Sequence, residues 1–394
     1  MKLTWRYCSV ALIYLACTGT VRSEQFAPAE PGGYAAATAW ASERPQRLDS
    51  AVEIPRADHP LLTGASYLNV NGGEAAVYGG DTACGDTCCT PLWAHTNSVF
   101  GELLFLRARN AEVAYAVPID GAIVAPPNSP IQIGPVAVAD PDYSTGFRIG
   151  GTYALDQCSS LQFTYSRFES NTTSTANTLA PNVLRSVVLH PGTANAGSDF
   201  LDATANLDVD FDLVDLDYRA VWAAGDLWAV NYLVGARYAN LTQDFNAVYT
   251  NTGTTDNLST NVNFDGGGIR LGLDAQRFAA NSGLMLYGKT SASFVAGQFN
   301  ARYTQGSDVD PVIVDTNWKA GRLVSILDLE LGLGWQSACG RWRLTSGYLV
   351  SGWFNTVRTN QWINSVQNNN FVGLSDATQV ITFDGFTTRL EYRW

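Results

Sequence analysis

Charge and long apolar runs are both scarce in this sequence. Only 15% of its 394 residues are charged, against roughly 25% in an ordinary globular protein, so the surface is not expected to be wet on all sides. Beyond residues 1–23, no segment reaches the ~18 unbroken apolar residues of a membrane-spanning helix. Aromatic residues make up 11% of the chain. This composition fits the wall of a transmembrane β-barrel, whose strands bury one face in lipid and the other in a polar lumen.

Residues suited to catalysis are scarce as well. Of the three histidines, His59 and His95 precede the predicted strands, and His190 has no acid within four residues on either side. A hydrolytic site needs a histidine paired with an acid or a serine, so we predict no enzyme. The glycines at 266–268 enter a strand and not a helix, which argues against a phosphate loop. No cofactor is predicted, and the net charge of -12 argues against nucleic acid as a partner.

Three segments are predicted along the chain. In residues 1–23, Lys2 and Arg6 precede a short apolar stretch and small residues precede Glu24, which is typical of an export signal. Cys17 leaves lipidation open as an alternative, although Tyr14 stands where a lipidation motif has leucine. Residues 24–97 are rich in Pro, Ala, Gly and Ser and predict a partly disordered periplasmic leader. Residues 98–394 predict the barrel.

Apolar and polar residues alternate after residue 100, as they do when successive side chains point to opposite faces of a strand. Leu327, Leu329 and Leu331, for example, alternate with Asp328 and Glu330. We predict an all-β, antiparallel, up-and-down barrel of ten strands, near 99–117, 143–155, 159–171, 205–223, 226–246, 262–278, 283–303, 319–336, 341–356 and 378–394. A further hairpin near 65–78 would make twelve. A soluble β-sandwich is the alternative, but it predicts shorter strands.

The predicted connections alternate between short and long. The long ones lie near 118–142, 172–204, 247–261, 304–318 and 357–377. Outer-membrane barrels have short periplasmic turns and longer external loops. The pattern therefore predicts a bacterial outer-membrane location with both termini in the periplasm.

Two strands depart from simple alternation. Between residues 208 and 222 the apolar positions change from odd, ending at Leu213, to even, starting at Val214. One extra residue would produce this change, so we predict a β-bulge near these two residues. The strand at 101–109 is apolar on both faces, which would suit packing of the leader inside the barrel.

Charged residues on the strands are expected to face the lumen, because each Arg or Lys costs roughly 2–4 kcal/mol on the lipid face near the midplane. These predicted pore-lining residues are Arg148, Asp215, Asp217, Arg219, Arg237, Arg270, Asp274, Lys289, Asp328, Glu330, Arg343, Arg389, Glu391 and Arg393. They suit a charged constriction that selects ions, or a ladder of paired acids and bases that fills the lumen. Ten strands predict a narrow lumen. If it conducts, the acidic balance of the chain favours cations.

Five cysteines remain after the predicted signal. Cys84, Cys88 and Cys89 precede the first strand, and Cys158 and Cys339 fall in short turns. The topology places all five in the periplasm, where disulfides form. We predict that the leader cluster is stapled to one or both turns, leaving one thiol over. A metal site is the competing interpretation, but the cluster holds no histidine, so no metal is predicted.

The closing strand ends on an aromatic residue. Phe386, Leu390, Tyr392 and Trp394 share one face, opposite Arg389, Glu391 and Arg393. We interpret the aromatic face as the assembly signal that the barrel-assembly machinery recognises.

Several stretches resemble the Legionella-type major outer membrane protein family, and the members from planctomycetes look most similar. They are Phe-Gly-Glu-Leu-Leu-Phe-Leu-Arg-Ala from Phe100, Asp-Gly-Gly-Gly-Ile-Arg-Leu-Gly at 265–272, Gly-Tyr-Leu-Val-Ser-Gly-Trp-Phe at 347–354 and Phe-Asp-Gly-Phe-Thr-Thr-Arg-Leu at 383–390. The resemblance covers about 100–394 and implies a pore-forming outer-membrane protein without catalytic residues.

Two functions are therefore expected to compete. The first is a passive diffusion pore for ions or small solutes. The second is a structural or adhesive wall protein with a filled lumen. Outer-membrane lipid and the barrel-assembly machinery are the expected partners in both cases, and the sequence does not define an oligomeric state.

Overall fold

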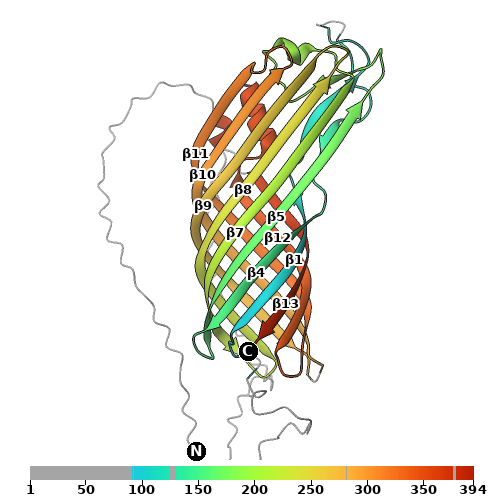
Figure 1. Cartoon of the computed structure of the whole chain (residues 1–394). Coiled ribbons are helices and arrows are strands. Elements are labelled where there is room, and N and C mark those ends of the chain that lie inside the picture. The colour runs from blue at the N-terminus through green and yellow to red at the C-terminus, as the bar shows by residue number, and fades with distance from the viewer. Residues whose placement is uncertain (1–90, 92, 125–128, 281, 376–378) are drawn as a thin grey trace, which may run out of the picture. The chain divides into compact units, whose positions relative to one another are not determined.

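A computed structural model describes residues 91, 93–124, 129–280, 282–375 and 379–394. Ten strands close into one antiparallel barrel in the order β1-β13-β12-β11-β10-β9-β8-β7-β5-β4 (Figure 1). They are β1 (Ser98–Arg109), β4 (Ser144–Ala154), β5 (Ser159–Asn177), β7 (Asp202–Ala224), β8 (Trp228–Thr250), β9 (Thr255–Phe278), β10 (Leu284–Ser307), β11 (Val314–Gln336), β12 (Trp342–Thr356) and β13 (Gln379–Arg393). Pairing of β1 with both β13 and β4 closes the barrel. The prediction of a ten-strand barrel is confirmed, and the hairpin considered at 65–78 lies outside the described residues.

All four short connections, 155–158, 225–227, 279–283 and 337–341, lie at one end of the barrel, here called the turn end. The start of β1 and the end of β13 lie there too. At the opposite end, called the loop end, the prediction of five long loops is wrong in two places. Strands β8 to β11 continue further toward this end than expected. Only residues 251–254 therefore connect β8 to β9, and only residues 308–313 connect β10 to β11. Strict alternation of short and long connections therefore fails.

The outer face of β7 changes from apolar to polar along its length. Leu216 and Tyr218 face outward near the turn end, whereas Asp208, Asp210 and Asp212 occupy the same face toward the loop end. The pairing of β7 with β5 and β8 is continuous through residue 214, so the predicted bulge near Leu213 and Val214 is wrong. The one register shift in this pair of strands lies between Val221 and Ala223. The apolar residues change from the outer to the inner face of β7 because the surroundings of the wall change from apolar near the turn end to polar toward the loop end. The backbone pairing stays in register.

The same change occurs on the neighbouring strands. On β9, Ile269, Leu271 and Leu273 face outward, followed toward the loop end by Asn263 and Asn261. Strands β7 to β11 have 23 or 24 residues, against the about 9 to 11 that a tilted strand needs to cross a bilayer. The apolar outer band therefore covers only the turn half of these strands, and the strands continue beyond the band toward the loop end.

Exposed aromatic residues mark the turn-end border of this band. They are Tyr153, Trp222, Trp228, Trp335, Trp342 and Trp394. Outer-membrane barrels carry such girdles where the apolar band meets the headgroups.

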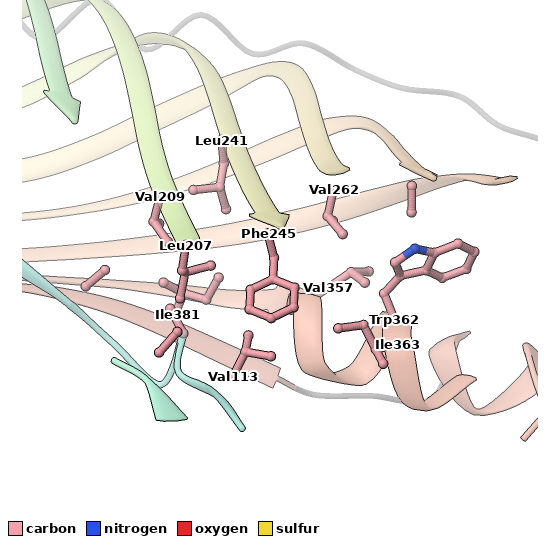
Figure 2. Close-up of a cluster of buried hydrophobic side chains, with 14 of the residues drawn as sticks. Val113, Leu207, Val209, Leu241, Phe245, Val262, Val357, Trp362, Ile363 and Ile381 are labelled. Atoms are coloured by element: carbon pink, nitrogen blue, oxygen red, sulfur yellow. The ribbon is translucent and has the colours of Figure 1, made fainter. Parts of the chain in front are cut away.

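The loop half of the barrel is filled by an apolar core. The connections at the loop end fold into or over this half. In them, β2 (Val113–Ile119), β3 (Ala137–Ala139) and β6 (Val183–Ser186) form a small sheet. The same connections also contain the short helices η1 (Ala194–Gly197), α1 (Thr359–Gln367) and α2 (Val372–Ser375). Figure 2 shows Val357, Trp362 and Ile363 in one cluster with Phe245 and Val262 of the wall. The sequence predicts 118–142, 172–204 and 357–377 simply as external loops, whereas parts of them pack into this core. Among the described helices, none has the length and apolarity needed to cross a membrane.

Candidate functional site: the charged interior

The turn half of the barrel encloses a charged cavity of about 140 Å³. It is lined by all fourteen charged residues that the sequence predicts to face inward: Arg148, Asp215, Asp217, Arg219, Arg237, Arg270, Asp274, Lys289, Asp328, Glu330, Arg343, Arg389, Glu391 and Arg393. The residues at 93–96 bound the cavity at the turn end, and Leu106, Phe211, Leu213 and Leu349 bound it toward the loops. The structure thus brings the fourteen together, while their role in a pore stays a prediction.

One ion-pair network surrounds Glu102, whose side chain is fully buried. Its Oε1 accepts from Arg148 Nη1 at 2.8 Å, and its Oε2 lies 2.6 Å from Arg389 Nη2. Arg148 also lies 3.7 Å from Glu330, which accepts from Lys289 Nζ at 3.2 Å and from the hydroxyl of Tyr287 at 2.8 Å. Strands β1, β4, β10, β11 and β13 are therefore joined across the lumen.

A second network surrounds Arg237 of β8. Its guanidinium makes a two-pronged pair with Asp215, with Nε–Oδ1 at 2.6 Å and Nη2–Oδ2 at 2.9 Å, and its Nη1 donates to Asp328 at 2.7 Å. Arg270 pairs with Asp215 at 3.1 Å and also with Asp217. Paired charges of this kind offset part of their desolvation cost. The network also leaves few charged groups available to a passing ion.

The charges nearest the turn end are less completely paired. Arg219 pairs with Asp274, Arg393 lies 3.8 Å from Glu391, and Arg343 donates to the amide oxygen of Gln336. Among the described residues, the charged groups of the cavity comprise eight bases (Arg148, Arg219, Arg237, Arg270, Lys289, Arg343, Arg389, Arg393) and seven acids (Glu102, Asp215, Asp217, Asp274, Asp328, Glu330, Glu391). The acidity of the whole chain is thus not a property of its lumen, which removes the basis for the predicted cation preference.

The segment at 93–97 crosses the turn-end mouth and is held by the barrel. The hydroxyl of Ser160 donates to His95 Nδ1 at 2.6 Å, and His95 Nε2 donates to Asn231 Oδ1 at 3.2 Å. Burial, reinforced by the positive charge of Arg219, lowers the pKa of His95 from 6.5 to about 4. Arg393 Nη2 donates to the carbonyl of Ala94 at 3.1 Å. A neutral histidine therefore closes this mouth at pH 7.

Between the charged cavity and the loops, four aromatic side chains meet in the middle of the barrel. Phe168, Phe211, Trp353 and Phe383 come from β5, β7, β12 and β13, and the ring centroids of the pairs in contact lie 4.8 to 6.0 Å apart. We call them the aromatic cluster. Phe168, Trp353 and Phe383 have no exposed surface. The described residues therefore leave no open path through this level of the barrel.

Comparison with known proteins adds a family to this geometry. A family model described as Legionella pneumophila major outer membrane protein precursor matches residues 89–393. The chain belongs to this family. The structure is also similar to the outer membrane protease OmpT of Escherichia coli, with 8% identity, a TM-score of 0.39 and coverage of 76% of this chain and 97% of that one. A search of curated proteins finds no match.

Two further structures are similar at the level of a barrel. The toluene transporter TodX of Pseudomonas putida has 10% identity, a TM-score of 0.28 and coverage of 76% of this chain and 90% of that one. A FadL homologue of Pseudomonas aeruginosa has 8% identity, a TM-score of 0.23 and the same coverages. Likenesses this distant carry no functional argument. Membership of the Legionella outer membrane protein family identifies the protein as a bacterial outer-membrane barrel.

The remaining predicted residues of this family member fall in two groups. Phe386, Leu390, Tyr392 and Trp394 lie on the outer face of β13, with Tyr392 against Trp342 at 4.8 Å; their role in assembly stays a prediction. Cys158 and Cys339 lie in turn-end connections, whereas Cys84, Cys88 and Cys89 lie outside the described residues. The staple therefore stays a prediction as well.

Proposed function

We propose that this outer-membrane barrel is a wall protein whose lumen is closed at rest, and not an open diffusion pore. The observation that carries the proposal is the aromatic cluster, which occupies the lumen between the charged cavity and the apolar core of the loop half. Below it lie the ion-pair networks around Glu102 and Arg237, and above it the apolar core around α1. An open pore would need a continuous column of water through all three.

Single-channel recording in planar bilayers tests this proposal. Folded protein is expected to insert without conductance steps, and a general porin added to the same membranes provides the positive control. Steps from the folded wild type would overturn the closed-lumen proposal. Heat-modifiable migration on gels verifies folding before each recording.

A gated pore is the second candidate, and one observation favours it. Four buried polar atoms of the α1 region have no hydrogen-bond partner among the described residues: Arg358 Nε, Asn360 Oδ1, Gln361 Oε1 and Trp362 Nε1. Each such atom costs about 1–3 kcal/mol. The polar groups buried where α1 packs inside the barrel are therefore poorly hydrogen-bonded. Opening of the lumen would begin at this helix.

Replacing residues 358–375 with a Gly/Ser linker, with and without Trp353→Ala, tests the gated pore. The first change removes α1 from the interior of the barrel. The second removes one of the four side chains of the aromatic cluster. Conductance from either folded variant, with a silent wild type, would support the gate. Silence from both folded variants would leave the wall protein as the function. In neither case do we propose catalysis, because the described hydrogen bonds join the side chain of His190 to the amide of Gly192, at 3.1 Å, and not to an acid or a serine.

A further inference from the structure

The turn-end layer of the charged cavity contains a base that has no acid partner. Arg343 is the one base among the eight cavity bases that forms no ion pair within 4.0 Å with the described residues. Its Nε and Nη2 both donate to Gln336 Oε1, at 3.2 and 2.8 Å. Since a guanidinium has five N–H donors, three of them remain without a hydrogen-bond acceptor among the described residues.

The surroundings of Arg343 increase the excess of positive charge. Arg343 and Arg219 are both neighbouring positive charges of Arg393, and Glu391 is an acid that lies within the influence of Arg343 and Arg393. Glu391 lies 3.8 Å from Arg393, longer than a hydrogen-bonded pair. The side chain of Arg393 is directed to the closing segment, donating to Ala94 O and Thr96 Oγ1. The carboxylate of Glu391 thus lies near the guanidinium groups of Arg343 and Arg393. Neither guanidinium donates a described hydrogen bond to it.

Buried charge of one sign must be compensated. Transfer of an unpaired ion into a low-dielectric interior costs several kcal/mol even after relaxation. The cavity cannot shed its excess charge by deprotonating an arginine, because arginine stays charged in proteins. A small anion that enters the cavity would compensate this excess charge.

We infer that the turn-end layer of the cavity, at Arg343 and Arg393, is a binding site for one small oxyanion, a phosphate or a carboxylate. Planar guanidinium groups bind both by paired N–H···O bonds. The cavity of 140 Å³ has space for about ten water-sized probes, which accommodates such an anion together with part of its hydration. The site is independent of the proposed function, because a closed barrel and a gated one contain the same cavity.

Calorimetric titration of the folded full-length protein in detergent, with inorganic phosphate as the probe and ionic strength held constant with NaCl, tests the inference. Acetate in a parallel titration distinguishes the carboxylate from the phosphate class. The test variant is Arg343→Gln, and Arg343→Lys retains the charge while losing the planar fork. The matched control is Arg302→Gln, which removes an exposed arginine paired with Asp315 at 2.9 Å on the outer face.

Wild type and Arg302→Gln are expected to bind one oxyanion saturably, and Arg343→Gln is expected to bind it about tenfold or more weakly, as for loss of a charged hydrogen bond. An intermediate affinity is expected for Arg343→Lys. Absence of saturable binding of either probe by the folded wild type would overturn the site. Equal binding by wild type and Arg343→Gln, or loss of binding in Arg302→Gln, would overturn the assignment to Arg343.

Discussion

Glu102 is the residue that the sequence did not disclose. Its strand, β1, is apolar on both faces, so alternation gives no side for the lone acid. The structure shows Glu102 beside Arg148 of β4 and Arg389 of β13 in the register. Both arginines were predicted to face inward from their own strands. Matching the acid with the two arginines on neighbouring strands would have predicted that Glu102 faces the lumen. That match requires knowing that β1 lies between β4 and β13.

Glu102→Gln is expected to destabilise the barrel strongly. The substitution removes the acid shared by two arginines and leaves them uncompensated in a buried setting, which costs about 3–5 kcal/mol. Urea unfolding in lipid vesicles measures the change. The control is Glu169→Gln, since Glu169 pairs with Arg167 on the exposed outer face, where a pair is worth about 1 kcal/mol or less. Equal effects of the two substitutions would contradict the importance of the Glu102 network.

His95 predicts a pH dependence with a defined sign. Its pKa is about 4 in the folded protein and 6.5 as a free side chain, so below pH 6.5 the unfolded chain takes up a proton that the folded chain does not. The free energy of unfolding should therefore fall between pH 6.5 and about 4, by on the order of 2 kcal/mol, and change no further from this group below that range. Above pH 6.5 the contribution is constant.

The difference in unfolding free energy between wild type and His95→Gln, measured at pH 7 and pH 4, isolates this contribution from the carboxylates. The difference should shrink toward acid pH. The matched variant His190→Gln, at the loop end, should parallel the wild type. A His95→Gln profile that also parallels the wild type would show that the histidine does not close the mouth in a neutral form.

At the scale of elements, the sequence predicts the strands of the turn half well and those of the loop half less well. The outward Leu216 and the inward Asp217 follow the rule for a barrel in lipid, whereas Phe211 and Asp212 follow the opposite rule for a barrel in water. A single rule applied to the whole strand therefore produced the false bulge. Helix α1 could not be predicted for a different reason. It has nine residues, and no side-chain hydrogen bond caps its N-terminus at Arg358, so contacts with the wall hold it.

Arginine substitutions along the outer face of β7 should locate the border of the apolar band. Leu216→Arg places a charge in the band and is expected to cost about 2–4 kcal/mol if it lies near the midplane. Thr204→Arg places the same charge on the same face of the same strand near the loop end, where the cost should be near zero. Unfolding in lipid vesicles measures both. Equal costs would mean that the lipid reaches the loop half.

At the scale of the whole molecule, the inner and outer surfaces change together. Where the outer face is apolar, the lumen holds paired charges. Where the outer face carries aspartate and asparagine, the lumen holds aromatic and aliphatic residues. Each half of the wall thus presents one apolar and one polar side, and only their order is reversed. The closed lumen follows from this arrangement, because an apolar interior in the loop half must be packed to exclude water.

The two described cysteines predict how the leader is attached to the barrel. Cys158 joins β4 to β5 and Cys339 joins β11 to β12, so β4, β1, β13 and β12 separate them along the wall. At about 4.8 Å per strand, this separation exceeds the roughly 7 Å Cα limit for a disulfide between them. Any disulfide formed by either cysteine must therefore involve the leader or another chain.

We expect non-reducing peptide mapping of protein isolated from membranes to find Cys158 or Cys339 linked to the peptide that carries Cys84, Cys88 and Cys89. Such a link would fasten the leader beside the mouth that His95 closes. A Cys158→Ser/Cys339→Ser variant should then lose the linked peptide without losing the barrel, because backbone pairing of β1 with β13 and β4 closes the ten strands. Full alkylation of both thiols in the wild type without reductant would contradict the attachment, and a link between two chains would replace it with a covalent oligomer.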